Sequence, residues 1–509
     1  MGRKQAQLGL AAAGLFLAAL DTYAVVTLLP QMLSAVEVPV DRLEAAAPIL
    51  TGFLGGYVVA MPLLAAFSDA RGRLPAFTAA IAVFGLGSII TALAPALGWL
   101  VLGRVLQGLG GGALVPLSLA LAADLYPAGR RSLPLGAVSA VQEAGSVVGP
   151  VYGAYLAVGL GGWRAVFWLN LPLGALVLAG LWASQRRRGP ARDALPGPTR
   201  KEEAAGGVDW AGALLLGLGL ALIVFALYPD DPQQRPVNRF AAPLLVGGIV
   251  VLAAFGWREA RHLSPLIARG LLRRPAFSGA LVANLVTGAA LMVALVDIPV
   301  LARGVFDLST EDSGLLLIRL LLGVPLGALL GGWLGSRVGR RWTACAGLVL
   351  AAAAFALMSG WRVDELKISN GPASVELFLC GLGFGLVIAP LTAAVLDLTD
   401  PSQHGLASSL VVLARTLGMV IGLASLTAFG LSRFQRIFAE RSCDSVSSTG
   451  GLRAQLTAFE TCVRGALLQE YREIFLVAAA ICLLGAVVAL LTLGASRERL
   501  SEPHAAAPA

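Results

Sequence analysis

The sequence predicts an all-α polytopic membrane protein, and three observations support that prediction. Of its 509 residues, 57% are hydrophobic and only 13% are charged. The mean hydropathy of the chain is +0.79. Apolar stretches long enough to cross a bilayer as helices, about 20 residues each, recur from one end of the chain to the other.

The apolar stretches divide the chain into its predicted elements. They number fourteen and lie at 8–33, 46–67, 75–95, 98–125, 133–158, 163–184, 209–228, 240–259, 276–301, 312–335, 343–361, 374–397, 405–432 and 471–494. An even number of crossings places both termini on one side of the membrane. The first stretch follows Gly2-Arg3-Lys4, carries Asp21 and lacks a small-residue cleavage site, so it is expected to be an uncleaved helix rather than a signal peptide.

Basic residues indicate which side that is. They fall in loops of one parity: Arg3/Lys4, Arg71/Arg73, Arg130/Arg131, Arg186–Arg188, Arg273/Arg274, Arg337/Arg340/Arg341 and Arg497/Arg499. Because cytoplasmic loops carry the excess of Lys and Arg, both termini are expected in the cytoplasm. The formal net charge of +8 is therefore assigned to topology, and no nucleic-acid partner is expected.

An internal repeat divides the chain. The segment Asp124–Gly149, "DLYPAGRRSLPLGAVSAVQEAGSVVG", aligns without a gap on Asp397–Gly422, "DLTDPSQHGLASSLVVLARTLGMVIG". Repeated halves of this kind build transporters that rock around a central site. We therefore expect three units in one chain. They are a six-helix bundle over 1–185, a cytoplasmic linker with two inserted helices over 186–275, and a second six-helix bundle over 276–509, which includes a periplasmic extension over 433–470 and a cytoplasmic tail.

Charged residues within the apolar stretches are candidate functional groups. An ionised side chain at the centre of a bilayer costs roughly 3 kcal/mol or more, so such residues face a cavity or a partner. Six qualify by depth: Asp21, Arg104, Glu143, Asp297, Arg319 and Arg415.

Three pairings are considered for these charges. Asp21 is a candidate proton carrier, loaded from the periplasm and released inside; the alternative is a structural pair with Arg104. Arg415 occupies the repeat position next to the one that matches Glu143, so the pseudo-twofold predicts an ion pair that forms in one state and breaks in the other. Asp297 and Arg319 either serve the cavity or pair structurally.

Two further motifs have physical interpretations. Asp69, Gly72 and Arg73 lie at a cytoplasmic helix end, and with Asp124 they are expected to form a charge latch between the halves; the alternative is simple topology anchoring. Three glycines at four-residue spacing share one face of the fifth helix, where they permit close approach of a neighbour, and a proline among them is expected to kink that helix. These residues are Gly145, Gly149, Gly153 and Pro150.

The motifs together resemble those of the major facilitator superfamily. Asp69-x-x-Gly72-Arg73, Arg104-Val-Leu-Gln107-Gly108 and Gly145-x-x-x-Gly149-Pro150 resemble its signatures, and "LDTYAVVTLLP" resembles the first-helix motif of its fourteen-helix drug/proton antiporter branch. The resemblance implies the major facilitator fold. The sequence departs from the pattern at Ala65, Ala70 and Ser336. The first-half gate is expected to survive these departures, whereas Ser336 in place of an Asp leaves open whether the second half has a charge-based gate.

A closer resemblance indicates the cargo. "ALDTYAVVT", "AVQEAGSVVGPVYGAYL" and "HGLASSLVVLARTLGMVIGLASL" are similar to the mycobacterial triacylglyceride-exporting transporters that work with a periplasmic lipid-carrying lipoprotein. The resemblance implies a proton-coupled lipid exporter in which Asp21, Glu143 and Arg415 serve coupling and gating. The alternative is a multidrug/proton antiporter that exports small amphipathic compounds.

Periplasmic features are expected in two places. Asn370-Gly371, between short alternating runs, predicts a hairpin turn. The polar segment 433–470 is expected to extend the last two helices beyond the membrane, with a Cys443–Cys462 disulfide on the oxidising side. This platform is expected to guide a lipid or dock a carrier protein; the alternative is a solvated loop without partners.

Enzymatic chemistry is not expected. The only histidines are His262, His404 and His504, and no metal cluster or nucleophile–base pair stands out. Without a Walker loop, the expected energy source is the proton gradient, with no cofactor, in a monomer.

Overall fold

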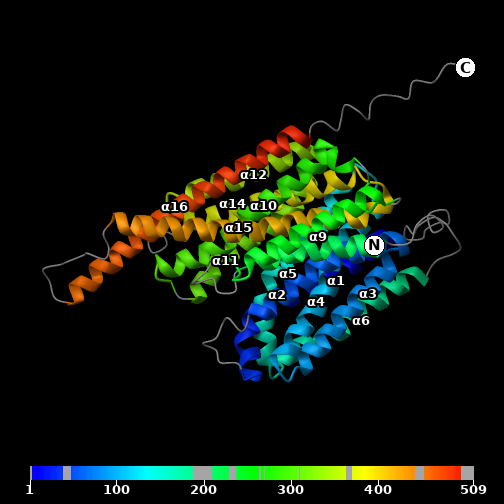
Figure 1. Cartoon of the computed structure of the whole chain (residues 1–509), viewed down its shortest axis with the longest axis horizontal. Helices are drawn as coiled ribbons and strands as arrows, with labels where there is room; N and C mark the ends of the chain where they lie inside the picture. The colour runs from blue at the N-terminus through cyan, green and yellow to red at the C-terminus, as the bar shows by residue number, and fades with distance from the viewer. Residues whose placement is uncertain are drawn as a thin grey trace, which may run out of the picture.

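The computed structural model of the chain describes residues 3–37, 47–186, 209–228, 237–262, 265–268, 270–308, 310–362, 370–441 and 452–493. These residues form fourteen α-helices and two short 3-10 segments (Figure 1). Thirteen of the helices are long and apolar enough to cross a membrane. The fourteenth, α5, falls short because Gln142, Glu143 and many small residues lower its hydropathy.

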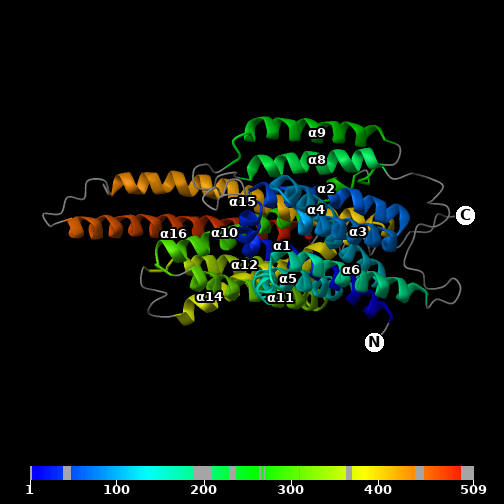
Figure 2. The ribbon, with the colours of Figure 1, turned by 90° about the horizontal axis from the view of Figure 1, so that it is seen from below.

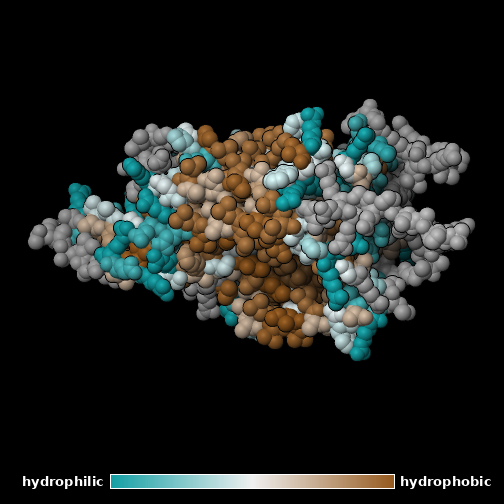
Figure 3. Space-filling view, turned by 90° about the horizontal axis from the view of Figure 1, so that it is seen from above, coloured by the Kyte–Doolittle hydropathy of each residue, from teal (hydrophilic) through white to brown (hydrophobic). Residues whose placement is uncertain are grey.

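The helices are those of a multi-pass membrane protein. On the face shown in Figure 3, apolar residues form a band across the middle of the molecule, with hydrophilic residues on either side of it. Helices suit this environment because each satisfies its own backbone hydrogen bonds in the absence of water.

The first half of the chain forms six helices. They are α1 (Arg3–Ala35), α2 (Ala47–Arg71), α3 (Arg73–Leu93), α4 (Leu97–Leu125), α5 (Ser132–Gly159) and α6 (Trp163–Arg186). Glycines let them approach closely: a Cβ added at Gly108 of α4 would lie 2.1 Å from the backbone oxygen of Phe53 in α2.

Six helices also form the second half. They are α10 (Pro275–Gly304), α11 (Thr310–Arg337), α12 (Arg340–Met358), α14 (Asn370–Leu396), α15 (His404–Glu440) and α16 (Leu452–Thr492), with 3-10 segments η2 (Leu271–Arg273) and η3 (Pro401–Gln403). The last two helices have 37 and 41 residues. They are much longer than a bilayer crossing needs, and both project from the bundle together (Figure 1).

Two helices lie outside both halves. Helix α8 (Trp210–Leu227) packs on α2 and contacts α15, and α9 (Ala241–Arg261) packs on α8, so that α9 is the outermost layer (Figure 2). Asp209 accepts the Gly212 N–H at 2.9 Å and a hydrogen bond from Arg258 Nη2 at 2.7 Å. Burial alone would raise the pKa of Asp209, but these hydrogen bonds outweigh it and hold the pKa below its usual value. The linker residues 187–208 lie outside the described part.

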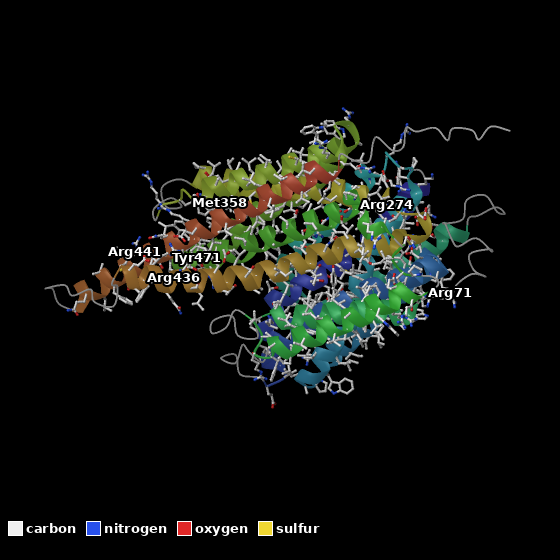
Figure 4. All side chains as sticks on the ribbon, turned by 45° about the horizontal axis from the view of Figure 1, so that its top comes forward. Arg71, Arg274, Met358, Arg436, Arg441 and Tyr471 are labelled. Atoms are coloured by element: carbon white, nitrogen blue, oxygen red, sulfur yellow. The ribbon has the colours of Figure 1, made fainter. Side chains whose placement is uncertain are left out.

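The two ends of the molecule differ in what they carry. Helix α1 begins and α16 ends at one end, here called the termini side, where Arg71 and Arg274 also lie (Figures 1 and 4). The opposite end is the far side, where α15 and α16 project and Arg436 and Arg441 lie (Figure 4).

The predicted hairpin turn is wrong. Asn370 and Gly371 begin helix α14, because the apolar run that follows them extends the helix back to these residues. Residues 363–369, which precede them, lie outside the described part of the chain, as do residues 442–451 between α15 and α16.

Candidate functional site: ion pairs within and between the two halves

Asp21 of α1 lies at the centre of a polar cluster inside the first half. Its Oδ2 accepts hydrogen bonds from Arg104 Nη1 at 2.8 Å and Gln107 Nε2 at 3.1 Å, and its Oδ1 accepts one from Asn170 Nδ2 at 2.6 Å. Ser88 completes the cluster by accepting from Gln107 Nε2 at 3.0 Å and from Asn170 Nδ2 at 3.2 Å. Side chains of four helices, α1, α3, α4 and α6, therefore meet in one cluster around the Asp21 carboxylate.

The Asp21 cluster is closed to its surroundings. The side chains of Asp21 and Arg104 are each 1% exposed, and the Arg104 guanidinium carbon lies 4.2 Å from the centre of the Phe53 ring. The structural pair with Arg104, the alternative considered from the sequence, is thus present in this conformation. A carboxylate that accepts three hydrogen bonds is suited to be ionised here, and a proton on it would leave Arg104 without its counter-charge.

A second ion pair joins the two halves. Arg415 Nη1 of α15 lies 3.3 Å from Glu143 Oε1 of α5, which is the pairing that the internal repeat predicts. The contact is an ion pair without hydrogen-bond alignment, because Nη1 has no hydrogen-bond partner. It is therefore looser than the Asp21–Arg104 pair and suited to be broken.

A third cluster closes the termini side. Arg73 Nε donates to Asp124 Oδ2 at 2.7 Å, and its Nη1 donates to Asp69 Oδ1 at 2.6 Å and to Ser68 Oγ at 2.8 Å. Arg73 is 3% exposed. Gly72, which precedes it, has a φ of 92°, a conformation that favours glycine. The sequence motif thus places one guanidinium between the ends of α2 and α4.

This cluster extends into the second half. Asp69 accepts the backbone N–H groups of Gly405 and Leu406, each at 2.9 Å, at the first turn of α15. A carboxylate at that position satisfies orphan N–H groups and complements the helix dipole. His404 Nδ1 lies 2.6 Å from Asp124 Oδ1, with the His404 side chain fully buried. Sequence reasoning placed His404 near a loop and gave it no role.

A corresponding contact runs in the other direction, from a basic residue of the first half to an aspartate of the second half. Arg131, which precedes α5, donates from Nη1 to Asp397 Oδ1 at 3.2 Å and to the Leu396 carbonyl at 3.1 Å. Asp397 also pairs with Arg340. The second half, whose charge-based gate the sequence left open, carries a charge pair at this end: Ser336 replaces one Asp, but Asp397 and Arg340 form the pair that corresponds to Asp124 and Arg73.

The two contacts are related by the internal repeat. The alignment of the repeat matches Arg131 with His404 and Asp124 with Asp397. In each half, the residue at the start of a helix contacts the aspartate of the other half: Arg131 contacts Asp397, and His404 contacts Asp124. Arg131 Nη1 and His404 Nε2 lie 3.5 Å apart. We call this set (Asp69, Arg73, Asp124, Arg131, Arg340, Asp397 and His404) the crossed latch.

The two remaining charges of the apolar stretches are not paired with each other. Arg319 Nη1 donates to Ser374 at 2.7 Å, while Asp297 of α10 lies near a second carboxylate, Glu470 of α16. The structural pairing of Asp297 with Arg319 is therefore not formed in this conformation. Among the described residues, no three His, Cys, Asp or Glu side chains gather as metal ligands.

The glycine face of α5 packs on α1. Added Cβ atoms at Gly145, Gly149 and Gly153 would each lie less than 3 Å from α1, the nearest atoms being Ala19 Cβ at 2.7 Å, the Leu20 oxygen at 2.8 Å and Ala24 Cβ at 2.9 Å. Pro150, beside this face, accepts a hydrogen bond at its carbonyl from Thr27 at 3.2 Å. The helix that carries Glu143 is therefore held against the helix that carries Asp21.

The predicted disulfide falls partly outside the described residues. Cys462 in the projecting part of α16 is disulfide-bonded, while Cys345, Cys380 and Cys482 are free. Cys443, the partner that the sequence predicts, lies outside the described part, so the pairing stays a prediction.

Comparison with known proteins identifies the family. The sequence profile of the Major Facilitator Superfamily matches residues 11–208, 203–423 and 314–508. A triacylglyceride transporter of Mycolicibacterium hassiacum is 39% identical over 96% of this chain and 91% of its own length. One of Mycobacterium tuberculosis is 39% identical over 96% of this chain and 94% of its own.

Solved structures support the same fold. The human organic anion transporter MFSD10 superposes with a TM-score of 0.59 at 18% identity, covering 95% of this chain and all of that one. The Escherichia coli fucose:proton symporter gives 0.57 at 14% identity, covering 95% and 98%. Taken with the repeated six-helix halves and the ion pairs between them, these matches show that the chain belongs to the Major Facilitator Superfamily.

Proposed function

We propose that this protein is a proton-coupled secondary transporter that exports triacylglyceride-like lipids from a bacterial inner membrane by alternating access. In this proposal the termini side faces the cytoplasm and the far side the periplasm, because basic residues such as Arg71 and Arg274 gather at the termini side. The chain acts as a monomer with no cofactor and uses the proton gradient as its energy source.

The buried Asp21–Arg104 pair is the observation that carries the coupling. Both side chains are 1% exposed and 2.8 Å apart, so protonation of Asp21 changes the charge balance of a site that water does not screen. In the proposed cycle a proton from the periplasm neutralises Asp21 and frees Arg104. The rearrangement of α1 and α4 then reaches α5, whose glycine face packs on α1.

Gating is assigned to the contacts between the halves. The crossed latch holds the cytoplasmic ends together in this conformation, and Glu143–Arg415 joins α5 to α15 deeper in the molecule. Alternating access requires these pairs to break together, after which the halves rock around their centre.

A lipid substrate is supported by the relatives and by the composition of the apolar stretches. The relatives are named triacylglyceride transporters and match almost the whole chain. Apart from the charges named above, the inner stretches consist mostly of Ala, Val, Leu and Gly, with few aromatic residues. A cation-exporting drug pump needs acidic and aromatic groups to hold positive charge, so the multidrug reading is the second candidate.

The projecting parts of α15 and α16 are the proposed site for a periplasmic lipid-carrier lipoprotein. They are held together by Arg433 and Glu473, whose atoms lie 2.5 and 2.8 Å apart, and by the ring contact of Phe438 with Phe459. Such a paired extension is stiff enough to guide an alkyl chain away from the membrane. Leu456, 53% exposed, offers an apolar contact there.

Reconstitution tests the proposal. Proteoliposomes that contain a fluorescent triacylglyceride and an imposed pH gradient should release the lipid to a soluble acceptor, whereas Asp21→Asn should abolish the gradient-driven part. Thr22→Ser, at the next position, is the matched control. Gradient-driven efflux of ethidium without lipid transfer would favour the multidrug alternative, and lipid transfer that ignores both the gradient and Asp21→Asn would contradict proton coupling.

A further inference from the structure

The outer surface of the first half carries a groove between α3 and α6. Its volume is about 300 Å³, at the lower end of the range for small-molecule sites. Gly85 of α3 and Gly174 of α6 contribute no side chain, which leaves a trough between the two helices. Its rim is open, since Leu86 is 50% exposed and Ala175 is also exposed.

One polar side chain lies among the apolar lining of this groove. Asn170 is 2% exposed and lines the inner wall. Its Nδ2 donates to Asp21 and Ser88, and its Oδ1 is buried without a hydrogen-bond partner among the described residues. A buried acceptor without a donor is unfavourable, so a ligand that donates a hydrogen bond there would be favoured.

The groove runs along the membrane normal from this acceptor. Asn170 is seven residues into α6, about 10 Å below the far-side end of the helix at 1.5 Å per residue. The lining continues to Leu178, about 12 Å further toward the centre of the bilayer. The shape is therefore a polar point near the far-side leaflet followed by an apolar channel that is open to the lipid.

The lining restricts the chemistry of the occupant. A trapped water molecule needs two to four polar partners, and the remaining lining residues, such as Ile81, Ile89 and Leu171, offer none from their side chains. No charged residue lines the groove, so an ionised headgroup would lack a counter-charge. A neutral molecule with one hydroxyl group and one alkyl chain matches both parts of the groove, the polar acceptor and the apolar channel.

We propose that the α3–α6 groove binds a neutral, hydroxyl-bearing single-chain lipid, of the long-chain alcohol or monoacylglycerol class, whose hydroxyl donates to Asn170 Oδ1 and whose chain lies along Gly85 and Gly174. This site is on the lipid-facing side of the first half and is separate from the contacts between the halves. It lies one side chain away from Asp21, because the same amide donates to that carboxylate. The proposal concerns binding alone and stands or falls independently of the transported cargo.

Photolabelling tests the site without any transport assay. Protein in nanodiscs of phosphatidylethanolamine and phosphatidylglycerol is exposed to a diazirine-bearing hexadecanol or to its methyl ether, and labelled peptides are mapped by mass spectrometry. The alcohol should label α3 and α6 peptides about fivefold more than the ether, the ratio expected for one hydrogen bond of about 1 kcal/mol. An excess of unlabelled monoacylglycerol should compete.

Variants on the rim separate a site from general lipid contact. Ala175→Phe fills the groove and should reduce labelling, and Ala82→Phe fills it from the opposite wall. Leu176→Phe is the matched control, because Leu176 is 67% exposed and does not line the groove. Equal labelling by alcohol and ether, or labelling that both groove-filling variants leave unchanged, overturns the proposal.

Discussion

His404 of α15 and Asp124 of α4 belong to opposite halves of the chain, and their Nδ1 and Oδ1 atoms lie 2.6 Å apart in a fully buried contact. Asp69 fixes the same helix start by accepting the N–H groups of Gly405 and Leu406. The first turn of α15 is thereby held by two carboxylates of the first half, which makes it the natural place for the closed end of the molecule to open.

Removing the imidazole should open this end. Hydrogen bonds to charged groups contribute about 1.5–3 kcal/mol, so His404→Ala is expected to shift the ratio of the two conformations about ten- to hundredfold away from the one described here. Spin labels at Leu160→Cys and Gly360→Cys, at the far-side ends of α5 and α12, report the change as a shorter distance in pulsed electron resonance.

The control for His404 is another histidine of the chain. His262 follows α9, away from the crossed latch, and His262→Ala should leave the distance distribution unchanged. If His404→Ala and His262→Ala give the same distribution, the crossed latch does not hold this conformation.

Arg73 should not tolerate lysine. Its Nε and Nη1 atoms reach Asp124, Asp69 and Ser68 at once, and a lysine ammonium cannot span all three from a single point. Arg73→Lys is expected to lower stability by about 3 kcal/mol, the order of a buried ion pair that loses one partner, and thermal unfolding in detergent measures it. Arg71→Lys, at an exposed position, should unfold as the wild type does.

Much of the fold could be predicted from the sequence, since each predicted apolar stretch corresponds to a helix. Hydropathy identifies the segments that must lie in the membrane. The repeat relates the two halves, and for that reason Glu143 and Arg415 could be predicted to lie close together. The Asn370-Gly371 turn was predicted wrongly, because a local turn signal was outweighed by the adjoining apolar helix.

The site was less accessible to sequence reasoning. Depth alone selects candidate charges, but it does not say which of them meet, and Asp297 and Arg319 do not pair. His404 is the first residue of α15, and its contact with Asp124 depends on how the halves dock. The repeat alignment of His404 with Arg131 was the available signal, because the two residues lie at the starts of the pseudo-equivalent helices α15 and α5.

Two glycines related by the repeat should respond differently to the same substitution. A Cβ added at Gly418 of α15 would lie 1.8 Å from the backbone oxygen of Leu285, whereas at Gly145 of α5 it would lie 2.7 Å from the Ala19 methyl group. An alanine methyl group is fixed to its backbone, so neither neighbour yields easily, but the overlap at Gly418 is larger. Gly418→Ala should therefore cost about 1–3 kcal/mol and more than Gly145→Ala. Gly98→Ala, with no atom within 4 Å, is the thermal-unfolding control, and equal losses at Gly418 and Gly98 would contradict the packing.

Structural and coupling roles of Asp21 can be separated by a double substitution. Asp21→Asn leaves Arg104 buried without a counter-charge and should destabilise the protein by about 3–5 kcal/mol, while Asp21→Asn combined with Arg104→Gln removes both charges and should recover most of that loss. Transport driven by a pH gradient should stay absent in both variants, because neither retains the carboxylate that exchanges the proton. Thermal unfolding and proteoliposome transport measured on the same preparations distinguish the two roles. A double variant that regains gradient-driven transport together with stability would assign Asp21 a purely structural role, since its charge would then matter only as a partner for Arg104.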